Sequence, residues 1–327
     1  EEAKKAIPYH ARKSEKAERV RAAVHVARSE PGIPIDAMEL DTDPLAFNVL
    51  NGTVDLKSGE LRPHRREDLI TKLAPVRHDP AATAPRWEQF VREIMQGNEN
   101  LARFLQRLAG CALTGLVRDH GIAIFYGEGK NGKSTFVRAL QEVWGRDYSR
   151  SAPAEMLMSR KNDAHSSERV ILVGTRFVAC VEVEEGGRFN EALLKQLTGA
   201  DFLTARKLYG EAFDFVPTHK LVVCVNHRPV IRGSDHGIWR RIWLVPFNVK
   251  FENPDLELGA KLAAEASGIL NWAIQGCRDF LADGLNPPEE VAAATEEYRN
   301  DMDQVGRFLE DRCELVEDGL TTAKDLH

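Results

Sequence analysis

The sequence predicts an α/β fold built around a parallel sheet. Between residues 118 and 250, short apolar runs alternate with segments of helical periodicity, and strands that alternate with helices are typical of parallel sheets. A glycine-rich loop joins the first apolar run to the helix that follows it. The chain has 327 residues, 43% hydrophobic and 29% charged, which is an ordinary globular composition with length for roughly two domains.

Residues 1–117 are expected to form an N-terminal region of mixed elements. Val20, Val24 and Ala27 recur at helical spacing, and Asn51-Gly52 is typical of a hairpin turn. The expected elements are a helix over 1–30, a proline-rich linker over 31–44, a hairpin over 47–61, a strand over 69–76 and helices over 87–116.

The predicted core spans residues 118–250, and a helical, acidic region follows over 251–327. In the core we expect strands over 122–126, 176–183, 220–225 and 242–247, helices over 134–143 and 190–197, and a hairpin over 202–215 with Gly210 near its tip. The chain begins without methionine and ends in a helix-like segment. We therefore expect a fragment of a longer protein.

Charge is unevenly distributed along the chain. The net charge is −6, but residues 251–327 carry −12, which leaves +6 on residues 1–250. Because patches decide polyanion binding more than the total does, nucleic acid is not excluded. No apolar run approaches the ~20 residues of a membrane helix, and the scattered cysteines suit a reducing compartment. We expect a cytoplasmic protein without membrane contact.

The motif with the clearest chemistry is GEGKNGKST, which matches G-x-x-x-x-G-K-S/T and lies between a predicted strand and a predicted helix. Glycines let backbone amides surround phosphate groups, and a helix N-terminus adds partial positive charge. Lys133 would reach the β- and γ-phosphates of ATP, and the Ser134 hydroxyl would bind Mg²⁺. The predicted nucleotide site comprises Gly127, Glu128, Gly129, Lys130, Asn131, Gly132, Lys133, Ser134 and Thr135.

Polar residues follow two of the predicted strands. Glu182 and Glu184 alternate with Val183 at the end of one strand, so both can point to one face. A carboxylate there could hold Mg²⁺ and orient the attacking water, although a solvated strand end is the simpler alternative. Asn226 ends another strand, and its amide could hold the water or merely cap a turn.

Basic residues occur at two further places. Arg240 and Arg241 enter an apolar strand, where they could form a structural salt bridge or provide an arginine finger to phosphate. Arg206, Lys207 and Tyr209 lie near the tip of the predicted hairpin. This combination suits a DNA backbone with one stacked base, and a solvated surface hairpin is the alternative.

The ordered set of motifs resembles superfamily 3 helicases, in the branch of bacteriophage, plasmid and poxvirus primase-helicases. The segments that carry the similarity are GEGKNGKST (127–135), VEVEEG (181–186), LLKQLTGADFLTARKLYG (193–210), FVPTHKLVVCVNHRPVI (215–231) and WRRIWLVPF (239–247). A stretch over residues 41–63 also resembles the domain that precedes the ATPase in this branch.

The resemblance implies an AAA+-like P-loop ATPase, ATP and Mg²⁺, and a ring, usually hexameric, that moves along single-stranded DNA. It implies a primase domain upstream in the full-length protein. Glu182 would lead the hydrolysis motif with Glu184 assisting, Asn226 would be the sensor, and Arg240 or Arg241 would act on the neighbouring subunit's ATP. The hairpin tip would project into the ring channel.

This chain departs from the family pattern at Val183, which separates carboxylates that are adjacent in many members. The choice of base among Glu182, Glu184 and Glu185 therefore stays open. Two alternatives to the helicase also stay open: an ATP-binding assembly module without turnover, and a monomeric P-loop enzyme of other purpose.

Overall fold

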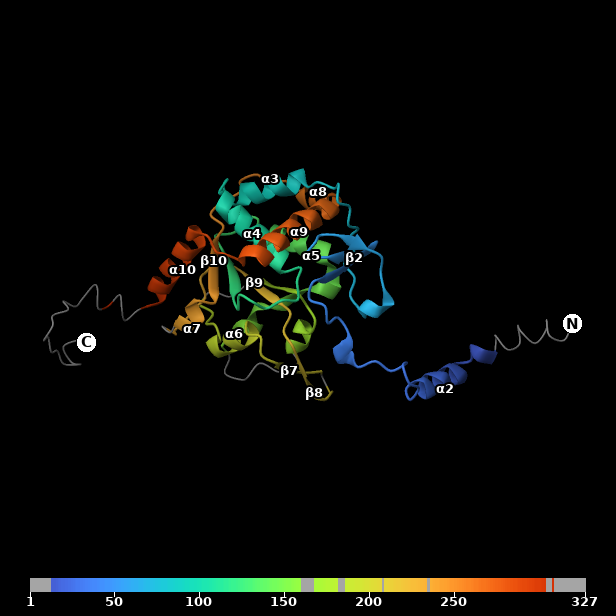
Figure 1. The fold of residues 1–327 in the computed structure, drawn as a ribbon. Coiled ribbons are helices and arrows are strands. Elements are labelled where there is room, and N and C mark those ends of the chain that lie inside the picture. Colours follow the sequence, from blue (N-terminus) through green and yellow to red (C-terminus); the bar gives the residue numbers. More distant parts are fainter. Residues whose placement is uncertain are drawn as a thin grey trace, which may run out of the picture. The chain divides into compact units, whose positions relative to one another are not determined.

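The computed structural model describes residues 13–159, 168–181, 186–207, 209–233, 236–303 and 308 (Figure 1). Contacts divide the chain into two units, Glu1–Thr42 with Arg66–Thr71, and Asp43–Arg65 with Lys72–His327. These units split the chain elsewhere than at residues 117 and 250, and the domain boundaries proposed there stay predictions.

The described part of the first unit contains little regular structure. Its elements are helix α2 (Ala17–Ala27) and the 3-10 turns η1 (Ala37–Glu39) and η2 (Arg66–Asp68). Every residue of α2 is at least partly exposed. The Asp36 carboxylate caps η1 by accepting a hydrogen bond from the Met38 amide at 2.9 Å. The helix predicted over residues 1–30 is confirmed for Ala17–Ala27, and residues 1–12 lie outside the described part.

The second unit begins with a small antiparallel sheet of β1 (Ala46–Val49), β2 (Gly52–Asp55) and β3 (Leu61–Arg62), which confirms the predicted hairpin. The prediction of a strand over residues 69–76 is wrong. Only Ala74 forms an isolated bridge to Val49. Pro75 lacks an amide donor, and the Leu73 amide instead bonds the Asp147 carboxylate at 3.0 Å.

A parallel sheet forms the centre of the second unit. Within the described residues its order is β10-β4-β9-β6-β5, and all neighbours are parallel. The strands are β4 (Ile122–Tyr126), β5 (Ser149–Pro153), β6 (Phe177–Val181), β9 (Lys220–Val225) and β10 (Ile242–Pro246). The α/β class with a parallel sheet is confirmed. Edge strand β5 was missed, because Ser-Arg-Ser-Ala-Pro has no apolar pattern.

Alternate side chains of each central strand enter two different cores. Phe125 and Val222 face a core shared with the N-terminal helices, whereas Ile124 and Val223 face a second core. Strands buried on both faces have continuous apolar sequences, which is why these strands could be predicted from the sequence. The first core also takes in α3 (Pro85–Ile94), α4 (Glu99–Cys111), α5 (Lys133–Tyr148), α8 (Leu258–Ala264) and α9 (Ala266–Asp283).

The second core is covered by α6 (Glu191–Leu197), α7 (His236–Trp239), η3 (Ala154–Leu157), η4 (Glu168–Leu172) and the hairpin of β7 (Leu203–Arg206) and β8 (Ala212–Phe215). Helix α10 (Glu289–Met302) lies along the outer edge of β10 (Figure 1). There the Leu244 amide donates to the Thr295 hydroxyl at 3.0 Å. The helices predicted over 87–116, 134–143 and 190–197, the hairpin over 202–215 and the helical C-terminal region are confirmed for the described residues.

Two expectations about composition can be compared with this fold. Cys111, Cys180, Cys224 and Cys277 are free and buried, as small apolar side chains commonly are. In the part of the chain that the structure describes, no helix has the length and apolar character needed to cross a bilayer.

Candidate functional site

The loop over residues 127–132 joins β4 to α5 and depends on glycine for its path. Gly132 has φ +86°, and a Cβ there would lie 2.5 Å from Cγ2 of Ile94 on α3. A Cβ on Gly127 would lie 2.2 Å from the Phe247 carbonyl oxygen, just after β10. The loop backbone therefore passes close to both neighbours, which only glycine permits. The predicted strand–loop–helix arrangement is confirmed.

Lys133 is buried at the start of α5, with 5% of its surface exposed. Its ammonium donates to the Gly127 carbonyl at 2.5 Å and to Oδ1 of Asn226 at 3.2 Å. Burial lowers the pKa of this lysine, although the charge interaction with Cys224 opposes the shift. Two of the three N–H groups of this ammonium thus donate to protein oxygens. The oxygens of an anionic ligand could take the place of these acceptors with little movement of the lysine.

The other predicted loop residues surround this lysine. Ser134 is exposed beside it in the first turn of α5, and Thr135 is half-buried. Glu128, Gly129 and Lys130 are exposed. Asn131 is buried and has a structural contact, because its amide nitrogen donates to the Phe247 carbonyl at 3.3 Å. The first-turn amides of α5 and the Ser134 hydroxyl are the groups suited to oxygen ligands.

The structure brings Asn226 to Lys133, although they lie far apart in sequence. Parallel pairing sets Tyr126 opposite Val225, so the loop after β4 and Asn226 leave the sheet at the same edge. Strand β6 also ends there, with Val181 paired to Cys224. Glu182, Glu184 and Glu185 follow Val181 but lie outside the described residues. Their predicted roles stay predictions.

Arg240 and Arg241 differ in their surroundings. Nη1 of Arg241 donates to the His120 carbonyl and to the Thr198 hydroxyl, both at 3.1 Å. These bonds tie the starts of β4 and β10 to the end of α6. Burial and the neighbouring Arg240 lower the pKa of Arg241. Arg240 is exposed, so it is the arginine whose side chain is available to another molecule.

The β7–β8 hairpin presents its predicted residues to solvent. Tyr209 is 97% exposed and has φ +60°. Arg206 and Lys207 are also exposed. Nε of Arg206 donates to the Gly210 carbonyl at 2.9 Å, which helps to hold the tip in shape. The hairpin thus combines two cations with an aromatic ring that packs against little of the described chain.

A cavity beside the loop was missed by the sequence analysis. It has a volume of about 600 Å³ and is lined by Gly132 and Thr135 on one side. Phe90 of α3 and Phe251 after β10 line it on other sides, together with Leu258 and Leu262 of α8 and several polar residues. These residues come from segments far from the loop in sequence, and no motif marks them. Polar and apolar groups mix in this cavity.

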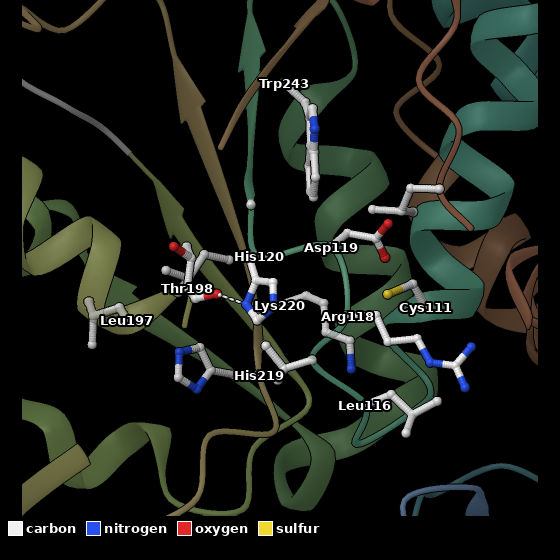
Figure 2. A pocket seen from close by; sticks show the side chains of 14 residues that line it. Cys111, Leu116, Arg118, Asp119, His120, Leu197, Thr198, His219, Lys220 and Trp243 are labelled. Carbon is white, nitrogen blue, oxygen red and sulfur yellow. Dashed lines mark hydrogen bonds between the residues drawn. The ribbon is translucent and has the colours of Figure 1, made fainter. Parts of the chain in front are cut away.

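A second, much smaller cavity lies at the other end of the parallel strands, near the starts of β4 and β9 (Figure 2). Lys220 begins β9 there and is buried, and burial lowers its pKa to about 8. Its ammonium donates to the Thr114 carbonyl, and to the Thr114 hydroxyl and the Thr218 carbonyl at 3.2 Å. The volume is about 20 Å³, which is room for about one water molecule. This cavity suits a water and not a nucleotide.

Two family profiles match the chain. One, described as "D5 N terminal like", matches residues 1–96. The other, described as "Family of unknown function (DUF5906)", matches residues 125–241 and so includes the loop, Lys133 and Asn226.

Curated relatives come from large DNA viruses. "Putative helicase L207/L206" of Acanthamoeba polyphaga mimivirus is 26% identical, covering 83% of this chain and 31% of the relative. "Putative helicase 022R" of Frog virus 3 is 23% identical, covering 88% and 38%. "Putative primase C962R" of African swine fever virus is 26% identical, covering 66% and 23%. The chain thus spans between 23% and 38% of the length of these relatives.

Among solved structures, the apo form of the NrS-1 C-terminal region is similar in fold. Its TM-score is 0.53 at 18% identity, covering 73% of this chain and 56% of that one. A second apo form gives 0.52 at 16% identity. Sequence therefore relates the chain to viral proteins named as helicases and primases, and structure relates its fold to the NrS-1 C-terminal region.

Proposed function

We propose that the chain is the ATPase part of a replicative DNA helicase of the superfamily 3, AAA+-like type. The observation that carries the proposal is the buried ammonium of Lys133, held between the Gly127 carbonyl and the Asn226 amide at the N-terminus of α5. The names of the viral relatives support the same function.

In the proposed reaction, the β- and γ-phosphates of ATP replace the present acceptors of Lys133. Water attacks the γ-phosphorus, the bond from that phosphorus to the ADP oxygen breaks, and ADP and phosphate leave. The proton of the water passes to a carboxylate, for which Glu182 is the candidate and Glu184 the assistant. Asn226 would orient the water or the γ-phosphate. Mg²⁺ would be held by Ser134 and Glu182 and would neutralise phosphate charge.

The cavity between α3, α5 and α8 is the proposed site of the base and ribose. Gly132 of the phosphate loop and Thr135 of the first turn of α5 both line this cavity, so a nucleotide could occupy the loop and the cavity together. Its volume of about 600 Å³ falls in the range of small-molecule sites, ~300–1,000 Å³. Phe90 and Phe251 offer apolar surface to a planar base.

A ring, hexameric in the proposal, would complete this site from a neighbouring copy. Arg240 is the better candidate for the finger, because Arg241 already donates to two oxygens of its own chain. Single-stranded DNA would contact Arg206, Lys207 and Tyr209 on the exposed hairpin. In the full-length protein, a primase domain would precede this part. A host-cell cytoplasmic location follows from the same proposal.

The test is the ATPase rate against protein concentration, with and without single-stranded DNA, at one fixed salt concentration because backbone contacts weaken with salt. The wild-type rate per subunit should rise with concentration and again with DNA. Lys133→Ala should lose nearly all turnover, whereas Lys57→Ala, which changes an exposed lysine in the turn between β2 and β3, should behave as wild type.

The other outcomes separate the alternatives. A Lys133→Ala protein as active as wild type would overturn the assignment of the site. A rate independent of both concentration and DNA would favour a monomeric P-loop enzyme. Rings that assemble with ATP but release no phosphate would favour the assembly module.

A further inference from the structure

Arg228 joins three parts of the molecule at the edge of the phosphate site. It lies two residues after Asn226, and its side chain is 17% exposed. Nη1 donates to the Asp301 carboxylate at 2.5 Å and Nη2 donates to the Glu297 carboxylate at 2.9 Å, both on α10. Its guanidinium carbon lies 4.8 Å from the ring centre of Tyr126.

The position of Tyr126 links this arginine to Lys133. Tyr126 ends β4 and directly precedes Gly127, whose carbonyl accepts from Lys133. Asn226, the other acceptor of Lys133, lies on the segment that carries Arg228. Arg228 thus contacts the end of β4, which precedes one acceptor of Lys133. It also lies in the segment after β9 that carries the other acceptor, Asn226. The motifs do not suggest the bonds of Arg228 to α10, because this helix lies far along the chain.

Helix α10 is itself held at two further points. The buried Tyr298 hydroxyl donates to the carbonyl of Pro229, which directly follows Arg228. Thr295 accepts from the Leu244 amide on the open edge of β10 at 3.0 Å. Since α10 is anchored to the sheet at Thr295, a displacement of residues 226–229 would act on its last turns, which carry Glu297, Tyr298 and Asp301.

We propose that Arg228 is a positioning residue that couples occupancy of the phosphate site to α10. The inference rests on the proposed function. When phosphate oxygens accept the hydrogen bonds of the Lys133 ammonium, the Asn226 amide oxygen loses its donor and its segment moves. Arg228 carries that movement to α10 through its bonds to Glu297 and Asp301. In the opposite direction, α10 holds Asn226 in the position required for turnover.

Removal of the two carboxylates tests the coupling without threatening the fold. Glu297 and Asp301 are 65% and 47% exposed, and exposed ion pairs stabilise proteins only weakly. Glu297→Ala/Asp301→Ala would remove both ion pairs between α10 and Arg228, while the contacts of Arg228 with the rings of Tyr126 and Tyr298 stay. Glu289→Ala/Glu296→Ala is the matched control. It removes two exposed carboxylates from the same helix and changes the net charge equally.

The first readout is hydrogen–deuterium exchange in α10 with and without Mg²⁺ and ATPγS, which needs binding but no turnover. Nucleotide should slow exchange in residues 289–302 of wild type and of the control by about fivefold, a common size for coupling between sites. The double variant should show no such change, although it binds ATPγS with an affinity within about threefold of wild type. Wild-type exchange that ignores bound nucleotide, or slowing that persists in the double variant, would overturn the coupling.

Turnover gives the second readout. Arg228→Ala should lower kcat about tenfold, as expected for a misplaced group near the reaction, while KM for ATP changes less than about threefold. Arg228→Lys, which keeps the charge but not the two-pronged geometry, should recover part of kcat. A purely structural role would instead lower Tm without separating kcat from KM.

The two hypotheses can fail separately. If wild type does not bind ATPγS, or if Lys133→Ala turns over normally, the proposed function and this coupling both fall. If Lys133→Ala is inactive and the Arg228 and α10 variants behave as wild type in both readouts, only the coupling falls.

Discussion

Arg241→Ala should destabilise the fold, because one guanidinium nitrogen connects three elements. Nη1 donates to the His120 carbonyl before β4 and to the Thr198 hydroxyl after α6, both at 3.1 Å. Hydrogen bonds from a charged donor contribute ~1.5–3 kcal/mol each when buried. Arg241 is only half-buried, so we expect a total loss of about 2 kcal/mol for the pair. At ~2–4 °C per kcal/mol, the loss lowers Tm by about 4–8 °C.

Arg240→Ala is the matched comparison for Arg241→Ala, because the two neighbouring arginines differ in their contacts. Its side chain is exposed, so Tm should change by less than about 1 °C. If Arg240 is the finger, kcat of the assembled protein should fall by about 10³. Thermal unfolding and ATPase rate, measured on both variants in one buffer, separate the two roles. An Arg241→Ala protein with wild-type Tm and the larger loss of kcat would refute the reasoning.

Three further perturbations follow from the geometry. Gly132→Ala should prevent nucleotide binding and lower stability by about 1–3 kcal/mol, because its φ is +86° and the new Cβ would lie 2.5 Å from Ile94. Nucleotide titration and thermal unfolding measure the two effects. Gly129→Ala, whose new Cβ meets no atom within 4 Å, should disturb binding and Tm less. Lys220 has its pKa lowered from 10.5 to about 8, so the unfolded chain binds more protons between these values and the stability of wild type relative to Lys220→Met should rise as pH increases from 8 to 10.5. A flat or falling difference in denaturant titrations would contradict that sign. Tyr209→Ser should weaken single-stranded DNA binding about 5- to 100-fold through lost stacking while Tm stays, and equal affinity at fixed salt would remove the hairpin from the DNA site.

Short-range patterns predicted most of the second unit. The runs at Ile122–Tyr126 and Lys220–Val225 are buried on both faces, and such strands show themselves as continuous apolar segments. The loop from Gly127 was recognisable because glycine, lysine and serine occur at a fixed spacing between a strand and a helix. By contrast, the edge strand β5 has the sequence Ser-Arg-Ser-Ala-Pro, which lacks an apolar run, and no local signal separates it from a loop.

Predictions about single residues depended on what each residue meets after folding. Arg240 and Arg241 are indistinguishable in sequence, yet Arg241 bonds His120 and Thr198 whereas Arg240 faces solvent. The strand expected over residues 69–76 had apolar residues in its favour, but Pro75 limits it to one bridge.

The sequence by itself determined which segments become buried strands, where the glycine loop lies and which lysine opens the helix after it. These properties depend on neighbouring residues and on how each segment meets water. Tertiary structure alone decided that Asn226 contacts Lys133, that Phe90 and Phe251 share a cavity, and that Arg228 pairs with α10. Such contacts join residues far apart in the chain. They depend on strand order and helix packing, which the whole core sets together and no local pattern encodes.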